Sequence, residues 1–392
     1  MVIAEPKGRP KLNRPPEIED HPPTELAAAQ RNQGIDHIRV GLTALVIFHH
    51  TAIVYGGSGG WFWRAEPDGS NPLLVVFNAV NQAYFMGFFF LLAGYFTPQA
   101  YEKKGSGRFL QDRLVRLGIP LAVFFLLLHP LTVAIVRTRD GHPLLEGWWQ
   151  MIVARDFGPG PLWFAEALLI FALAYVGWRE ALKRSARPAF SLAALPGNAI
   201  LAIAAVMIGI VSFLIRLVVP IGHEVAGLQL GYFAPYVFLF AAGCAASRSG
   251  LLESIDIRQA RLWMRVSVVS GLLLLVLFVT RGDAGGFEGG WTLNAFLYAL
   301  WDPVFAWGVI LGLLWGAPRW WPRQTPLGAW LGRGAFGAYI VHPPILVAIS
   351  LALAASGLPP LLKFAAVGLA ATVASFSVSA ILRAIPGVRS VI

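Results

Sequence analysis

Residues 198–220 read NAILAIAAVMIGIVSFLIRLVVP, and a stretch of this kind decides the fold class. It holds a single charged side chain, Arg216, and it is as long as the roughly 20 apolar residues that a helix needs to cross the hydrocarbon of a bilayer. Similar runs recur along the chain, so the sequence predicts an all-α, polytopic integral membrane protein with about ten transmembrane helices. The predicted spans lie near residues 38–55, 73–96, 117–136, 161–178, 198–220, 230–247, 264–280, 294–316, 334–356 and 361–384.

The overall composition supports this fold class. Of the 392 residues, 56% are hydrophobic and 13% are charged, about half the charged share of an average soluble protein. The single cysteine, Cys244, has no partner for an internal disulfide or a cysteine metal cluster. We therefore expect no metal site and no permanently bound cofactor, and we assign the net charge of +10 to loops rather than to a nucleic-acid partner.

The distribution of basic residues predicts the orientation. With the N-terminus in the cytoplasm, 23 of the 31 Lys and Arg residues fall in inside segments and five fall outside, as the positive-inside rule requires. An even number of spans then places both termini inside. We expect residues 1–35, which are rich in proline and charge, to form a disordered cytoplasmic tail, and residues 36–392 to form the membrane domain.

Polar side chains inside the predicted spans are the candidate functional residues, because they are costly at membrane depth. The topology divides them into an outer group and an inner group, which predicts a polar cavity that opens outward and a basic mouth that faces the cytoplasm. The outer group comprises His49, His50, Asn78, Asn81, Gln82, Glu166, Arg216 and Asp302; the inner group comprises Arg39, Arg113, Arg116 and Arg333.

The first span connects the two groups. Arg39 and His50 are eleven residues apart, close to three helical turns, so they share one face at a separation of roughly 16 Å. Such a helix can hold an anion at its cytoplasmic end and a base at the other. The alternative is that Arg39 is a positive-inside anchor and His50 a hydrogen-bonded histidine at the interface.

Five short motifs, in order, resemble those of the membrane acyltransferase family 3 over roughly residues 36 to 345. The first motif is the Arg39 to His50 spacing. The other four are FFFLLAGYF at residues 88–96, RLVRLGIP at 113–120, PLWF at 161–164 and AYIVHP at 338–343. In FFFLLAGYF, Ala93 replaces the usual serine of the family.

This resemblance implies a ten-helix fold in the bacterial cytoplasmic (inner) membrane and a reaction that crosses the bilayer. Cytoplasmic acyl-CoA would supply an acyl group to a hydroxyl outside, commonly on a glycan. Within the family the motifs look most like the branch that succinylates periplasmic glucans, so we expect succinyl-CoA or acetyl-CoA as the donor substrate. The expected partners are the lipid bilayer, acyl-CoA and a glycan acceptor, and the sequence gives no oligomeric state.

The resemblance and the depth assignment together give each candidate a role. We expect His50 as general base, with Arg39 and Glu166 in the catalytic group, and Glu166 orienting His50 or staying protonated. The expected CoA-binding residues are Arg39, Arg113, Arg116 and Arg333, and the expected substrate-binding residues are Arg216, Asp302, Asn81 and His342.

Each role has a structural alternative. Arg113 and Arg116 can be ordinary positive-inside residues, and Glu166 and Asp302 can pair with Arg216 or bond to backbone. His342 precedes two prolines, so its match can reflect a helix break. At the level of function, a transporter of a glycan precursor or anionic metabolite is the main alternative, and a membrane scaffold without chemistry is a third. Strict dependence on acyl-CoA separates an acyltransferase from a transporter.

Overall fold

The computed structural model describes residues 23–65, 69–184, 192–281, 285–321 and 325–392. Within these residues the chain is helical and contains no β-strand, so the predicted all-α fold is confirmed. The α-helices are α1 (Pro23–Val54), α2 (Pro72–Arg113), α3 (Ile119–Val123), α4 (His129–Arg137), α5 (Leu144–Val153), α6 (Trp163–Arg184), α7 (Asn198–Val218), α8 (Phe233–Ala246), α9 (Ile257–Arg281), α10 (Leu293–Trp320), α11 (Pro326–Ala352) and α12 (Pro360–Ala384).

The described part of the chain holds eight helices long and apolar enough to cross a membrane. One of them, Pro72–Asp140, is a continuous helical run that contains two of the predicted spans. The predicted span near 230–247 corresponds to a shorter apolar helix, Leu230–Ala246. The chain is therefore a multi-pass membrane protein, while the count of ten spans and the inside location of both termini stay predictions.

Helix α1 begins earlier than the sequence analysis expected. It starts at Pro23, so residues 23–35, which were predicted as part of the disordered tail, are helical. No proline follows Pro23 within this helix, and the run of alanines at 27–29 favours helix. Composition alone missed the extension because its polar residues resemble a tail. The rest of the predicted tail, residues 1–22, lies outside the described residues.

The run from α2 to α4 bends without ending. Gly105 adopts a non-helical backbone inside α2 with a φ of 72°, a conformation that glycine tolerates without a Cβ penalty. Two short π-helical segments, η1 (Leu114–Gly118) and η2 (Phe124–Leu128), each come just before a helix with proline at its second position. A proline ring clashes with the carbonyl four residues back, and the wider π turn accommodates it.

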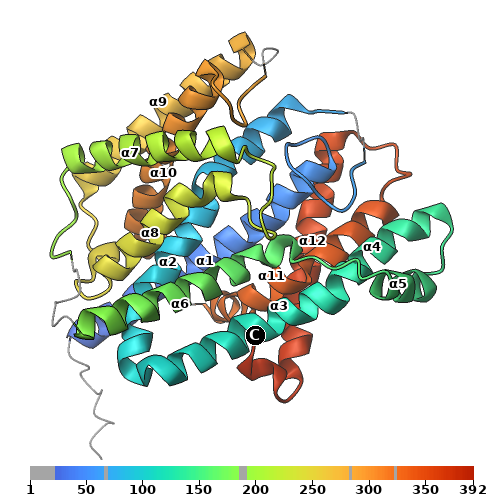
Figure 1. Cartoon of the computed structure of the whole chain (residues 1–392), viewed down its shortest axis with the longest axis horizontal. Helices are drawn as coiled ribbons and strands as arrows, with labels where there is room; N and C mark the ends of the chain where they lie inside the picture. Colours follow the sequence, from blue (N-terminus) through green and yellow to red (C-terminus); the bar gives the residue numbers. More distant parts are fainter. Residues whose placement is uncertain (1–22, 66–68, 185–191, 282–284, 322–324) are drawn as a thin grey trace, which may run out of the picture.

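Helix α5 was not among the expected elements. Its ten residues are too few to cross a bilayer, and they form an amphipathic helix that packs on α4 (Figure 1). Gly147 and Met151 face inward, whereas Leu145, Trp149 and Val153 are exposed. An exposed apolar face of this kind suits the surface of a bilayer.

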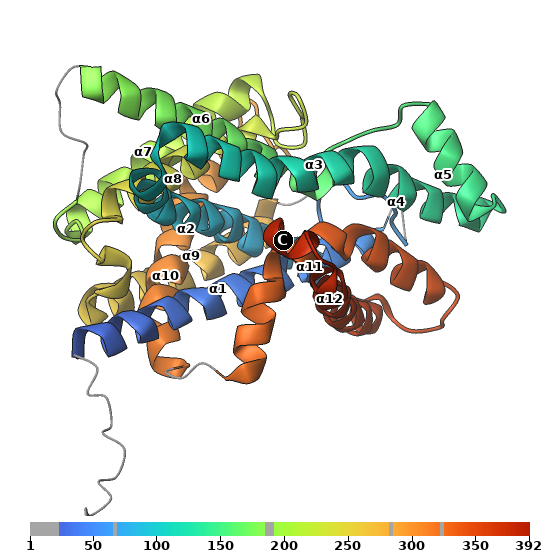
Figure 2. The same ribbon diagram turned by 90° about the horizontal axis from the view of Figure 1, so that it is seen from below.

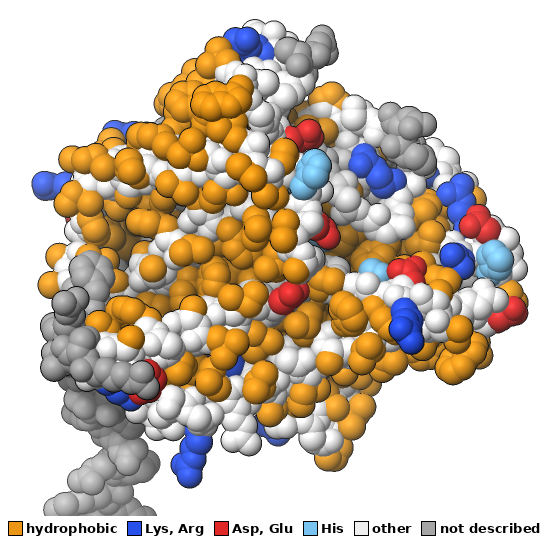
Figure 3. All heavy atoms as spheres, in the orientation of Figure 1, with side chains coloured by type: hydrophobic (Ala, Val, Ile, Leu, Met, Phe, Trp, Pro, Cys, Tyr) orange, Lys and Arg blue, Asp and Glu red, His pale blue; other side chains and the backbone are white. Residues whose placement is uncertain are grey.

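Helix α1 occupies the centre of the bundle. It packs against α2, α10, α11 and α12, and Figure 2 shows it crossing the molecule beneath α2 with α11 and α12 at its far end. Hydrophobic side chains cover most of the face seen in Figure 3, while charged side chains gather toward the end formed by α4 and α5. A side chain near the end of α1 therefore lies where several helices meet.

Helices α2 and α8 approach each other through two glycines. A methyl group added at Gly94 would lie 2.1 Å from the Phe240 carbonyl oxygen, and one at Gly243 would lie 2.2 Å from that of Leu91. Small residues let helix backbones pack closely in membranes, where apolar burial gives little driving force between helices. The glycine of the GYF motif is thus explained by packing.

We predict that Gly94→Ala destabilises the protein by about 1–3 kcal/mol or more, because the new methyl group must push α8 away. Gly177→Ala is the matched control, since Gly177 is helical and has open space around its Cβ position. The measurement is thermal unfolding of both variants in detergent. Equal unfolding midpoints for the two variants would show that the glycine contact carries no stability.

Candidate active site

Two histidines from distant parts of the chain meet near the end of α1. The Nδ1 atom of His50 on α1 lies 3.0 Å from the Nε2 atom of His342 on α11. Their rings are nearly parallel, at 12°, with centroids 5.1 Å apart. His342 is fully buried and His50 is partly exposed. Of the two histidines, His50 is therefore the more accessible.

The proline after His342 explains how that ring is held. In a helix the carbonyl of Tyr339 would accept a hydrogen bond from the backbone N–H of residue 343. That residue is Pro343, which has no N–H. The Tyr339 carbonyl oxygen instead lies 2.6 Å from Nδ1 of His342. The proline thus leaves a backbone acceptor free for the histidine that precedes it.

These contacts determine where the protons sit on both neutral rings. A carbonyl oxygen can only accept, so Nδ1 of His342 carries the proton and donates it. Nε2 of His342 is then the acceptor, and Nδ1 of His50 must donate to it. The Nε2 atom of His50 is left with a free lone pair. A neutral histidine in this tautomer is a general base with a fixed ring orientation.

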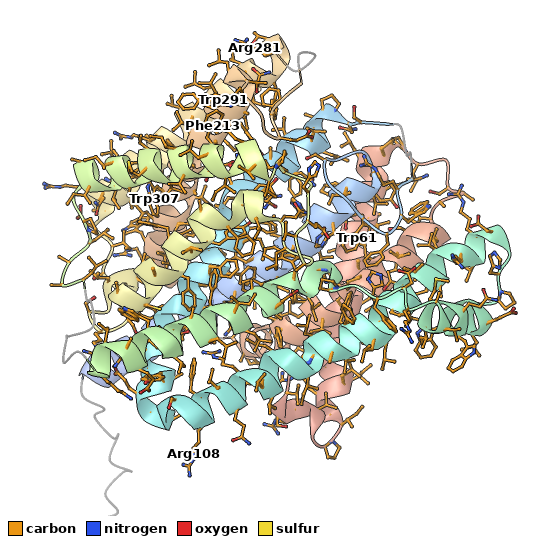
Figure 4. All side chains as sticks on the ribbon, viewed as in Figure 1. Trp61, Arg108, Phe213, Arg281, Trp291 and Trp307 are labelled. Atoms are coloured by element: carbon orange, nitrogen blue, oxygen red, sulfur yellow. The ribbon has the colours of Figure 1, made fainter. Side chains whose placement is uncertain are left out.

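Trp61 covers the His50 ring. The two rings stack at a centroid distance of 4.1 Å and an angle of 17°, and Figure 4 shows Trp61 beside α1. The Trp61 Nε1 atom is buried and has no hydrogen-bond partner in the described part of the chain. The tryptophan therefore brings an unused N–H donor next to the base.

The loop that carries Trp61 is tightly built. Gly56 and Gly59 have φ angles of 110° and 120°, which side chains with a Cβ rarely adopt. Arg64 donates hydrogen bonds to the carbonyls of Gly57 and Gly59 at 3.1 and 3.2 Å. The sequence analysis did not include Trp61 among the candidate functional residues. The run of glycines before it was the signal that this segment turns back onto the bundle.

His49 faces away from this pair and supports the loop. Its ring stacks on Phe85 at 4.9 Å, and its Nε2 atom lies 3.5 Å from the amide nitrogen of Asn78. That amide nitrogen also donates to the Ser58 carbonyl at 2.9 Å. The side chains of His49 and Asn78 therefore connect α1, α2 and the Trp61 loop.

Two of the family-like motifs touch beside His342. The Tyr339 hydroxyl donates to the carbonyl of Pro161, and the Tyr339 ring contacts Phe164 edge-on at 6.4 Å. Pro161 belongs to η4 (Gly160–Leu162), which leads into α6. The residue whose carbonyl orients His342 is thus fixed from its other end by the PLWF segment.

The structure pairs His50 with His342 rather than with Glu166. Glu166 is half-buried on α6, and its carboxylate borders the backbone of Gly227. It makes no hydrogen bond or ion pair with another described residue. The expected catalytic role of Glu166 stays a prediction. His342, which was expected to bind substrate, is the residue that orients His50.

Arg216 and Asp302 form a buried ion pair. The Nη2 atom of Arg216 lies 2.6 Å from Oδ2 of Asp302, and the two side chains are 0% and 6% exposed. Arg216 also donates from Nε to the Gly231 carbonyl at 3.0 Å and lies over the rings of Tyr232 and Tyr298. The arrangement is the alternative considered above, an internal pair, and it ties α7 to α10.

The remaining expected binding residues are spread over several elements. Arg39 is paired with Asp36 at 3.5 Å and is 44% exposed, and Arg116 is paired with Asp112 at 3.4 Å. Arg113 lies over the Phe109 ring. The described contacts do not join these side chains into one cluster. Arg333, at the surface of α11, lies within electrostatic range of Arg383 on α12, and Asn81 is buried with an unpartnered amide nitrogen.

Comparison with known proteins identifies relatives. Residues 32–383 match the family described as "Acyltransferase domain". The chain is 26% identical over 184 residues to the "Glucans biosynthesis protein C" of Salmonella schwarzengrund (strain CVM19633) and of Salmonella heidelberg (strain SL476), covering 43% of this chain and 45% of each relative. The aligned part thus spans less than half of the length of these relatives. No solved structure gives a match.

We predict that breaking the Arg216–Asp302 pair from one side costs about 3–5 kcal/mol, because the remaining charge stays buried without a partner. Arg216→Met and Asp302→Leu should each lower the unfolding temperature in detergent strongly, and the double variant should recover part of the loss. Additive losses in this double-mutant cycle would mean that the two side chains do not stabilise the protein as a pair.

Proposed function

The chain belongs to the acyltransferase 3 family of membrane proteins, and from that membership we propose that it moves a short acyl group from acyl-CoA to a hydroxyl of a glycan. Membership in this family supports membrane acyltransferase activity as its general class. The donor, the acyl group and the acceptor are our proposals. Family membership favours an enzyme over the transporter and scaffold alternatives.

The observation that carries this proposal is the free Nε2 lone pair of His50. A hydroxyl is a weak nucleophile at neutral pH, and acyl transfer to it requires a base at the reacting oxygen. The chain from the Tyr339 carbonyl through His342 to His50 presents such a base in one orientation. This is the arrangement of a base held by a second group, as in other acyl-transfer sites.

The proposed reaction needs no protein group other than the residues described above. His50 Nε2 takes the proton from the acceptor hydroxyl while that oxygen attacks the thioester carbonyl. The new C–O bond forms, the C–S bond breaks, and the thiolate of CoA leaves with the proton from His50. His342 stays neutral throughout and accepts a stronger hydrogen bond from the charged imidazolium of His50.

The donor would enter from the end of the bundle at which α1 begins. Arg39 lies three turns before His50 on the same face of α1, at roughly 16 Å. CoA carries phosphates, and arginine binds phosphate through paired hydrogen bonds. We therefore propose that Arg39, Arg113, Arg116 and Arg333 hold the nucleotide at the cytoplasmic side of an inner membrane, while its acyl arm reaches His50.

The acceptor proposal rests on the relatives. Those reported above are named for glucan biosynthesis, and the branch resemblance favours succinyl over acetyl as the group transferred. A periplasmic or cell-envelope glycan is accordingly the acceptor that we propose. His50 is partly exposed and lies near the C-terminal end of α1, three turns beyond Arg39.

Trp61 would assist the same step. Its Nε1–H group has no partner and lies beside the His50 ring. A donor in this position can bind the carbonyl oxygen as negative charge develops on it. We assign Trp61 a place in the site on this ground.

We predict that His50→Ala abolishes acyl transfer and that His342→Ala lowers kcat by about 10²-fold or more with little change in KM, because the base loses its orientation. His342→Gln should recover part of the rate, since its side-chain carbonyl can accept from His50 Nδ1. The measurement is the release of free CoA thiol in purified membranes, with succinyl-CoA and acetyl-CoA as donors.

Mass spectrometry of envelope glycans from a deletion strain complemented with each variant gives the second readout. Alkali-labile acyl groups should return with the wild-type protein and not with His50→Ala at equal membrane abundance. Identical glycans in all strains would exclude a glycan acceptor and favour the transporter. Equal rates for His342→Ala and His342→Gln would contradict the hydrogen-bonding role of His342.

We also predict that Trp61→Phe, which keeps an aromatic ring on His50 but removes the N–H donor, lowers kcat by about 10²–10³-fold. Trp63→Phe would not serve as a control, because Trp63 is itself buried in the same loop. Trp149→Phe is suitable, since Trp149 is exposed on α5. Wild-type kcat in Trp61→Phe would show that the indole acts by stacking alone.

A further inference from the structure

A small polar pocket lies beyond the end of α1, where the loop that carries Trp61 meets the turn between α11 and α12. It has a volume of about 230 Å³ and is lined by Tyr55, Trp63, Arg139 and Lys363, with the turn between α11 and α12 closing one side. Pockets for drug-sized ligands measure about 300–1,000 Å³. This one is smaller, so it fits one sugar unit or one charged substituent of a larger molecule.

The pocket is continuous with the candidate active site along the chain. Tyr55 comes five residues after His50, directly behind the last residue of α1. Trp63 comes two residues after Trp61, which stacks on His50. The backbone N–H of Ala65 donates to the Val54 carbonyl at 2.9 Å and fixes the loop against the end of α1. The loop that covers His50 with Trp61 therefore also lines the pocket, through Trp63 and Ala65.

Two cationic side chains reach the pocket from different elements. Arg139 belongs to η3 (Thr138–Asp140) and lies over the Trp63 ring at 5.8 Å. Lys363 is on the first turn of α12 and donates to the Ala354 carbonyl at 3.1 Å. Neither forms an ion pair with an acidic side chain in the described part of the chain. Two cations without a counter-charge around a small pocket favour an anionic ligand.

The other two lining residues are aromatic and buried. Trp63 is 8% exposed and Tyr55 is 3% exposed. The Tyr55 hydroxyl is buried and lies beside the Ser350 hydroxyl of α11. Amphipathic aromatic rings offer an apolar face together with a polar edge, which matches the mixed surface of a sugar.

We propose that this pocket binds a negatively charged sugar, with Arg139 and Lys363 on its anionic group and Trp63 and Tyr55 on its ring. The inference rests on the proposed function for its meaning: the pocket is then the subsite that places the acceptor glycan next to His50. We therefore expect the acceptor to be a glycan that carries phosphate or carboxylate groups.

Ligand binding tests the proposal without any donor. The probes are glucose 6-phosphate, glucuronate and neutral glucose, and the measurement is saturation-transfer NMR on the purified full-length protein in neutral detergent. We expect both anionic sugars to bind and glucose to bind at least tenfold more weakly. The double variant Arg139→Gln/Lys363→Gln should weaken the anionic sugars by about tenfold or more, as loss of charge-assisted hydrogen bonds implies.

Arg137→Gln is the matched control. Arg137 is the last residue of α4, two positions before Arg139, and it does not line the pocket. It should bind like the wild type, and all variants should elute as folded protein of unchanged unfolding temperature. Equal binding by the double variant, or equal binding of glucose, would overturn the proposal.

Two further arms separate the remaining possibilities. If phosphatidylglycerol co-purifies with the wild type, is absent from the double variant, and no sugar binds to either, the pocket holds a lipid headgroup and the proposal fails. His50→Ala should retain sugar binding, since the base does not line the pocket. If the anionic sugars bind but the glycans of the deletion strain are unaltered, the pocket is a sugar-binding site and the proposed reaction is rejected.

Discussion

The site depends on one backbone carbonyl that has no helical partner. Pro343 cannot supply the N–H that Tyr339 would otherwise bind, so the Tyr339 oxygen accepts from His342 instead. Three features of the site are consequences of that acceptor: the tautomer of His342, the direction of its hydrogen bond with His50, and the lone pair on the Nε2 atom of His50. A helix without the proline would satisfy its own carbonyl and leave the ring free to rotate.

The fold brings three separate segments to this carbonyl. The central position of α1 places His50 against α11, and the loop after α1 returns Trp61 onto the ring. The carbonyl of Pro161 in η4, just before α6, accepts a hydrogen bond from the Tyr339 hydroxyl. Each segment is held by backbone contacts of its own, such as the glycine turns and Arg64 in the loop. The site is therefore assembled on rigid elements, which suits chemistry that needs a fixed base.

The sequence predicts the membrane fold and one half of this site. Long apolar runs indicate which segments lie in the bilayer. Helix geometry then predicts that Arg39 and His50 share one face of the first span. The partner of His50 is 292 residues away, and spacing along one helix carries no information about a neighbouring helix. Trp61 and α5 were missed because each lies outside the apolar runs, whereas the Arg216–Asp302 pair was foreseen as an alternative because two opposite charges at membrane depth need each other.

The end of the histidine chain also matters for the membrane itself. A row of titratable groups inside a bilayer can conduct protons when each member both accepts and donates. Here the row stops at a carbonyl, which accepts a hydrogen bond but has no proton to pass on. A proton taken up by His50 has to return by the side from which it came. The protein can therefore hold a base within its membrane domain without providing a path for protons across the bilayer.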